Sequence, residues 1–203
     1  NVTDVNDHAP VFTSDGTATV AENAVTSTVI YDAATTDADG TVPNQAVTYS
    51  LKGDGSTDDA ELLNINGTTG EVTLKTSAKY EVKNSYAFTV VATNVGTGAT
   101  LATEQAVTVS VTDVAEAVTD LALSATGIDE NVDTTSGVKI GDISITDPDA
   151  SGNANVLTLE GTDKALFAIR NGTELFFIGS SPDFETKSSY SITLKATDGG
   201  LVY

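Results

Sequence analysis

Apolar residues recur along this chain at the two-residue spacing of β-strands. Short segments alternate apolar and polar side chains, or are apolar throughout, and they are rich in β-branched and aromatic residues. The clearest are segments 46–51, 71–74, 86–91 and 107–111. No stretch of a dozen residues has the spacing of an amphipathic helix. The pattern therefore predicts an all-β protein.

Turn-forming residues separate these segments. Asn66-Gly67, Thr69-Gly70 and Asp39-Gly40 lie between apolar segments in the first half, and Asn171-Gly172 and Asp198-Gly199-Gly200 do so in the second. About seven short strands per hundred residues, with turns between them, are typical of an antiparallel β-sandwich.

The sequence also repeats itself, at an offset that runs from 104 residues (Asn94 to Asp198) to 110 residues (Asp37 to Asp147). Insertions in surface loops explain the drift. Five landmarks return in order: Val2-Thr3-Asp4-Val5 as Val111-Thr112-Asp113-Val114, Ala21-Glu22-Asn23 as Asp129-Glu130-Asn131, Asp37-Ala38-Asp39 as Asp147-Pro148-Asp149, Tyr80-Glu81 as Phe184-Glu185, and Ala92-Thr93-Asn94 as Ala196-Thr197-Asp198.

The repeat predicts two tandem domains. The first spans residues 1–113, with residues 1–10 belonging to a preceding linker, and the second spans 114–203. The second has no counterpart of segment 104–112. We therefore expect it to lack its last strand in this chain, which leaves a sheet edge unpaired unless another chain completes it.

Composition narrows the function. The 203 residues include 29 Asp and Glu against 9 Lys and Arg, a net charge of -20, so a nucleic-acid partner is not expected. Without Cys there is no thiolate metal site or cysteine nucleophile, and the one His lies at position 8, so enzyme chemistry is not expected either. No apolar run approaches the roughly 18 residues of a membrane span, and we expect no membrane insertion of this segment.

Carboxylates make up most of the recurring landmarks, near the ends of predicted strands. Two unit charges about 4 Å apart repel by about 4 kcal/mol at an effective dielectric constant of 20, so clustered carboxylates need a cation. Oxygen ligands without His or Cys suit Ca²⁺ better than zinc or copper. An isolated Asp-x-Asp is usually a turn, but the repetition favours a metal site. The candidate ligands are Glu22, Glu81, Asp113, Glu116, Asp147, Asp149 and Asp198.

These residues resemble the cadherin repeat, and in particular the tandem cadherin-like repeats of large bacterial surface adhesins. Asp4-Val5-Asn6-Asp7-His8-Ala9-Pro10-Val11-Phe12 is similar to the family's inter-repeat linker, with His8 in place of an Asn. The landmarks at Glu22-Asn23, Asp37-Ala38-Asp39-Gly40, Asp183-Phe184-Glu185 and Ala196-Thr197-Asp198 resemble the family's other elements. The resemblance covers essentially the whole chain and implies two Greek-key β-sandwiches of immunoglobulin-like architecture.

The resemblance also implies where Ca²⁺ binds. The family's ions sit between successive repeats, at a junction that calcium stiffens. Here that junction would combine Glu22 and Glu81 of the first repeat, Asp113 and Glu116 of the linker, and Asp147, Asp149 and Asp198 of the second repeat. Lys79 and Ala117 stand where the family has further ligands, so we expect one or two ions there. Two half-sites would await other repeats: Asp4 to His8 with Asp37 and Asp39, and Glu130 with Asp183 and Glu185.

Two residues near these sites remain open to interpretation. His8 is expected to be an exposed linker residue rather than a metal ligand, and Asn94 is either an amide ligand or a turn residue.

The expected function is that of calcium-binding repeats in an extracellular, cell-surface adhesion protein, part of a larger exported or membrane-anchored chain. The partners would be neighbouring repeats and a homotypic or other cell-surface partner. Abundant Thr, Asp, Gly and Ala with few basic residues favours a bacterial source. The alternative is a carbohydrate-binding module on a cell or biofilm surface, against which stands the lack of Trp.

Overall fold

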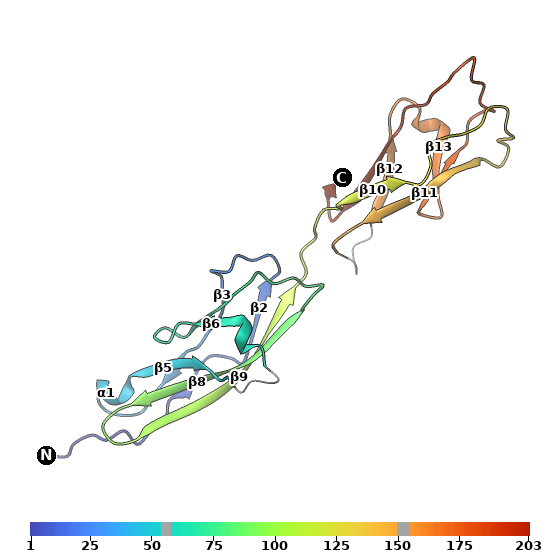
Figure 1. Cartoon of the computed structure of the whole chain (residues 1–203). Helices are drawn as coiled ribbons and strands as arrows, with labels where there is room; N and C mark the ends of the chain where they lie inside the picture. The colour runs from blue at the N-terminus through green and yellow to red at the C-terminus, as the bar shows by residue number, and fades with distance from the viewer. Residues whose placement is uncertain (54–57, 150–154) are drawn as a thin grey trace. The chain divides into compact units, whose positions relative to one another are not determined.

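The computed structural model describes residues 1–53, 58–149 and 155–203, and the chain divides into two compact units, Asn1–Val114 and Ala115–Tyr203. Both units consist mainly of β-strands (Figure 1). Among the described residues, no helix is long and apolar enough to cross a membrane.

Two sheets enclose the core of the first unit. A short pair, β1 (Val11–Phe12) with β4 (Thr35–Thr36), and two single turns, α1 (Val42–Gln45) and η1 (Ala60–Leu62), complete this unit. One sheet has the order β2 (Thr17–Ala21), β9 (Thr100–Thr112), β8 (Ser85–Val95) and β5 (Val47–Leu51), and the other has the order β3 (Val29–Asp32), β7 (Glu71–Leu74) and β6 (Leu63–Ile65).

The core of the first unit follows from the alternation seen in the sequence. Every second residue of β8 from Tyr86 to Asn94 is buried, and the side chains of Val90 and Val109 are fully enclosed. Tyr31 and Phe88 meet edge to face with their ring centres 6.0 Å apart. The predicted strands 86–91 and 107–111 are parts of one long hairpin, in which Ser85 pairs with Ser110 and Val95 with Thr100.

Strand β2 departs from the purely antiparallel pairing expected of the sandwich. This strand pairs in parallel with β9, from Thr17 opposite Thr108 to Ala21 opposite Thr112. The first long strand of this unit and its last strand thereby lie side by side and run the same way. Glu22 and Asp113, which directly follow β2 and β9, are consequently placed at the same end of the unit.

The second unit repeats the two-sheet architecture, and among its described residues η2 (Lys164–Leu166) is the one helical turn. One sheet has the order β10 (Asp120–Leu123), β11 (Val138–Thr146), β14 (Glu174–Phe177) and β13 (Phe167–Arg170), and the other has the order β12 (Val156–Glu160), β15 (Thr193–Asp198) and β16 (Leu201–Val202).

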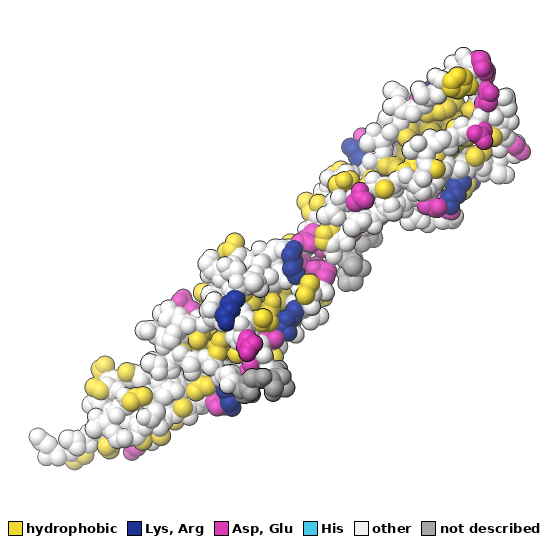
Figure 2. All heavy atoms as spheres, in the orientation of Figure 1, with side chains coloured by type: hydrophobic (Ala, Val, Ile, Leu, Met, Phe, Trp, Pro, Cys, Tyr) yellow, Lys and Arg dark blue, Asp and Glu magenta, His cyan; other side chains and the backbone are white. Residues whose placement is uncertain are grey.

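The counterpart of β9 in the second unit is the two-residue strand β16, which pairs with Thr197 and Asp198 of β15. A groove of about 720 Å³ opens in this unit, lined by half-buried apolar residues that include Leu123, Tyr190 and Leu194. Figure 2 shows hydrophobic side chains lying open on this unit. In the first unit, the corresponding apolar surface is covered by β9, whose Val107 and Val109 are buried in the core.

Candidate metal centre

Three predicted ligands come together at one end of the first unit. Glu22, Glu81 and Asp113 each offer a carboxylate oxygen, and these oxygens lie within 4.8 Å of one another. Glu22 is buried, whereas Glu81 and Asp113 are exposed. Several hard oxygen atoms at this spacing are what a divalent cation such as Ca²⁺ requires.

Backbone amides hold Glu22 in place and in its ionised form. Its Oε1 accepts a hydrogen bond from the Val114 amide (2.9 Å), and its Oε2 accepts one from the Tyr80 amide (3.1 Å). Burial is the largest single influence on the Glu22 pKa and raises it, but these two hydrogen bonds, a hydrogen bond with Asp113 and the charge of Lys79 together hold the pKa below its ordinary value. The buried carboxylate is therefore an anion at neutral pH.

The backbone conformation explains why an Asn follows both Glu22 and Glu130. Asn23 and Asn131 adopt left-handed conformations, with φ of 58° and 60°, which Asn tolerates better than most residues. The Asn23 amide donates to the Ala78 carbonyl, and the Asn131 amide donates to the Pro182 carbonyl. The chain thus turns directly after the glutamate. The carboxylate then faces the segment that precedes β8 in the first unit and β15 in the second.

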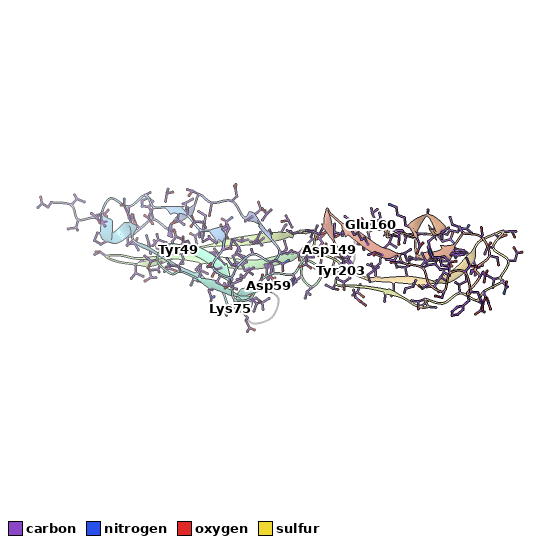
Figure 3. All side chains as sticks on the ribbon, turned by 90° about the horizontal axis from the view of Figure 1, so that it is seen from above. Tyr49, Asp59, Lys75, Asp149, Glu160 and Tyr203 are labelled. Carbon is purple, nitrogen blue, oxygen red and sulfur yellow. The ribbon has the colours of Figure 1, made fainter. Side chains whose placement is uncertain are left out.

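The second unit contains a group of its own, made of Asp147, Asp149 and Asp198, whose ligand oxygens also lie within 4.8 Å of one another. Asp149 and Asp198 are buried, and Asp147 is half-buried. The Asp149 amide donates to Asp147 Oδ1 (2.9 Å), which closes the tight turn of the Asp-x-Asp element. Asp149 lies at the same end of this unit as Tyr203 (Figure 3).

Glu116 participates in a different way from the other predicted ligands. Its backbone amide donates to Asp149 Oδ2 at 2.5 Å. Its own carboxylate belongs to neither three-carboxylate group among residues 1–53, 58–149 and 155–203. The linker thus orients an Asp of the second unit's group through its main chain.

The two predicted half-sites also form groups. Glu130, Asp183 and Glu185 gather in the second unit, all exposed, and the Phe184 amide donates to Glu130 Oε2 (3.2 Å), as the Tyr80 amide does to Glu22. Asp7, His8 and Asp39 gather in the first unit. His8 is exposed, as the sequence predicted, and its Nδ1 lies 3.0 Å from Asp39 Oδ1.

Amide side chains that the sequence patterns did not single out complete these groups. Asn44 is buried and donates through Nδ2 to Asp4 Oδ2 (2.8 Å), and Asn155 donates to Asp147 Oδ2 (2.6 Å). Asn94, left open above, is fully buried and donates to Asp37 Oδ2 (2.6 Å). Neither Asn44 nor Asn155 stands in a recurring landmark, so the sequence carried no signal for them.

Comparison with known proteins identifies the first unit. Residues 16–112 match the family model described as the cadherin domain. Human protocadherin-1 is 35% identical, over an alignment that covers 98% of this chain and 19% of that protein. Human protocadherin Fat 4 is 28% identical over 97% of this chain and 4% of its own length. The chain thus spans a small part of these relatives, and because both are human, they lend no support to the expected bacterial setting.

Solved structures match the whole fold. The crystal structure of the protocadherin gamma B4 extracellular domain has a TM-score of 0.74 and 27% identity, covering 100% of this chain and 31% of that one. Extracellular cadherin domains 1–4 of protocadherin gamma B7 have a TM-score of 0.73 and 23% identity, covering 98% of this chain and 49% of theirs. Residues 16–112 thus belong to the cadherin domain family, and the chain has the two-repeat Greek-key fold of tandem cadherin extracellular domains.

Proposed function

We propose that this chain is a pair of calcium-binding cadherin repeats from the extracellular part of a cell-surface adhesion protein, with Ca²⁺ at the junction of the repeats stiffening the pair. One observation carries the proposal: each unit has a group of three carboxylates with oxygens within 4.8 Å. The first group includes Asp113, and the backbone amide of Glu116, three residues later, donates to Asp149 of the second group, so both groups border the linker.

The chemistry of the donor set favours calcium. Both groups consist of carboxylates, and backbone carbonyls of the linker near Val114 and Ala115 would add further oxygens. Ca²⁺ accepts about six to eight oxygen ligands in irregular geometry, whereas Zn²⁺ favours nitrogen and sulfur. Glu22, Glu81, Asp113, Asp147, Asp149 and Asp198 would hold the ions, and Glu116 would add its carboxylate or act through its amide.

Repulsion explains why calcium would stiffen the pair. Two carboxylates 4.8 Å apart repel by about 3 to 4 kcal/mol at an effective dielectric constant of 20, and each group contains three of them. A divalent cation reverses the sign of this interaction. Ions shared by both groups would restrict the linker, and their removal would leave it free to bend.

The proposed role is mechanical and adhesive rather than enzymatic. Protocadherins are the relatives that match the chain over nearly its full length, and a homotypic or other cell-surface partner is proposed by that analogy. Carbohydrate recognition stays a prediction from the sequence, and binding to a glycan panel with and without calcium would test it.

A distance measurement across the linker tests the stiffening. The chain contains no Cys, so Thr68→Cys and Thr173→Cys, both at exposed positions, would give two unique sites for spin labels. We expect the distribution of label-to-label distances to narrow when Ca²⁺ is added to the protein. An equally broad distribution with and without calcium would contradict the proposal.

Matched variants test which carboxylate group causes the narrowing of the distance distribution. Asp147→Asn with Asp149→Asn removes charge from the group next to the linker and keeps the side-chain oxygens that accept hydrogen bonds. Asp183→Asn with Glu185→Gln changes the same number of charges in the group at Glu130. Only the first pair of substitutions should abolish the narrowing.

A further inference from the structure

The tripeptide Asn-Gly-Thr occurs once in each repeat, at the same turn. Asn66-Gly67-Thr68 connects β6 to β7, and Asn171-Gly172-Thr173 connects β13 to β14. The two copies stand 105 residues apart, which is within the range of offsets of the other repeated landmarks. Asn followed two residues later by Ser or Thr, without an intervening Pro, is the acceptor motif for N-linked glycosylation in secreted proteins.

The turns account for the Asn and the Gly of this motif but not for its Thr. Asn171 and Gly172 supply the positive φ angles of a tight hairpin, and Asn66 Oδ1 accepts from the main-chain amide of Thr68. Among the residues that the structure describes, neither the Thr68 nor the Thr173 hydroxyl forms a hydrogen bond, and both residues are exposed. Folding therefore leaves the hydroxyl unexplained, whereas the acceptor motif requires it.

The fold also leaves both Asn amides able to carry a sugar, because both residues are exposed. Two backbone amides donate to Asn66 Oδ1 (3.0 and 3.3 Å), so the side-chain oxygen, and not Nδ2, supports that turn. Asn171 Nδ2 donates to Glu174 Oε2, and an amide nitrogen that bears one sugar keeps one hydrogen for this contact. A Cβ added to Gly172 would meet no atom within 4 Å, so the space beside Asn171 is open.

We propose that Asn66 and Asn171 carry N-linked oligosaccharides, one on each repeat. In the transfer, Nδ2 forms a bond to the anomeric carbon of a lipid-diphosphate-linked oligosaccharide, the bond from that carbon to the diphosphate breaks, and the amide releases one proton. This inference rests on the extracellular location proposed above, because the transfer takes place in the secretory pathway. Hydrated glycans would keep both turns out of close protein contacts, so a homotypic partner would contact other surfaces of the repeats.

Expression of the chain behind a secretion signal in cultured mammalian cells tests both sites. Treatment with peptide N-glycosidase in H₂¹⁸O converts each glycosylated Asn to an ¹⁸O-labelled Asp, which peptide mass spectrometry locates. We expect the label at Asn66 and at Asn171. Thr68→Ala should remove the first label alone and Thr173→Ala the second alone, while Thr68→Ser, which keeps the acceptor motif, should retain both.

The proposal fails if Asn66 and Asn171 are unlabelled, if only one of them is labelled, or if the Thr→Ala variants keep their labels. Asn1-Val2-Thr3 also matches the motif, but Ser110 stands at the position of Asn1 in the next copy of the landmark, so this match does not recur. A label at Asn1 alone would likewise overturn the proposal. Calcium-dependent melting of the same preparation tests the proposed function separately: a glycosylated chain that calcium does not stabilise would contradict the calcium function alone.

Discussion

Asp59 and Asp163 occupy matching positions in the two repeats and make matching contacts. Each precedes a single helical turn, η1 or η2. Asp59 Oδ2 accepts from the Ala87 amide (2.8 Å), and Asp163 Oδ2 accepts from the Ser191 amide (2.7 Å). Each also forms an ion pair with a lysine, Lys83 or Lys187. The lysine Nζ atoms lie 5.4 Å and 4.8 Å from the ring centres of Tyr86 and Tyr190.

We expect Asp163→Asn to lower the melting temperature of the second unit by a few degrees. The hydrogen bond from Lys187 is the main cause that holds the Asp163 pKa below its ordinary value of 3.8, and the Ser191 amide adds to it. Ionised Asp163 therefore stabilises the fold above that value, and the contribution disappears as pH falls through the lower folded-state pKa. Thermal unfolding at pH 7 and at pH 3 measures the difference, which should shrink in acid.

The left-handed Asn23 gives a second residue-scale prediction. Asn23→Ala should cost about 1 kcal/mol of unfolding free energy, because Ala keeps the Cβ that is disfavoured at φ of 58° and lacks the polar side chain through which Asn tolerates it. Asn23→Gly, which tolerates this φ, should cost less. Urea denaturation separates the two, and equal losses would show that side-chain contacts rather than backbone conformation select Asn.

At the scale of single residues, the sequence patterns identified the carboxylates but not the amide side chains that donate hydrogen bonds to them. The Glu-Asn and Asp-x-Asp elements recur as local patterns, so Glu22, Asp147 and Asp149 were visible in the sequence. Asn44 and Asn155 act through contacts set by the fold, and in a chain with 29 acidic residues an isolated Asp such as Asp59 carries no distinguishing pattern. Its offset of 104 residues from Asp163 was the one available signal.

At the scale of elements, the two cores differ in completeness. Among the described residues, the first unit's core cluster has 14 buried residues, which include Val107, Val109 and Val111 of β9, and the second unit's has 4. The short β16 leaves the groove of the second unit open. Apolar burial is the main source of stability, so the second unit should be the weaker of the two.

Calorimetric unfolding of the whole chain should therefore show two transitions, with the second unit melting first. Leu175→Ala and Leu63→Ala are a matched pair, since both leucines are buried, at 1% and 2% exposure, and lie in different units. Each should cost about 2 to 5 kcal/mol. We expect Leu175→Ala to move the lower transition and Leu63→Ala the upper one, and the reverse assignment would contradict the comparison of the cores.

The turns show how far local sequence determines an element. Asn171 and Gly172 both adopt positive φ, 50° and 79°, in the tight connection between β13 and β14, as an Asn-Gly pair predicts. Asn66-Gly67 begins a longer turn instead: Asn66 Oδ1 accepts from the Thr68 amide (3.0 Å), and Gly70 takes the positive φ of 84°. The dipeptide predicts a turn in both repeats, but the length of the connection selects its type.

At the scale of the whole molecule, charge is the dominant feature. A net charge of -20 on 203 residues makes the folded chain repel itself, and the four groups of potential metal ligands found among the described residues concentrate this repulsion. The sequence predicted the two-repeat Greek-key fold because strand spacing, turns and repeated landmarks all agree. It did not reveal the parallel pairing of β2 with β9 or the contacts of His8, since these depend on how distant segments meet.

Calcium-dependent thermal unfolding tests the central claim most directly, with the unmodified chain compared with Asp147→Asn plus Asp149→Asn. At a free Ca²⁺ concentration about 100 times the dissociation constant, each independent site should add about 2.7 kcal/mol of stability. We predict a saturable rise in melting temperature that the double variant largely loses and that Asp183→Asn with Glu185→Gln retains. No calcium-dependent rise in the unmodified chain, or an equal rise in the double variant, would contradict a calcium site at these carboxylates.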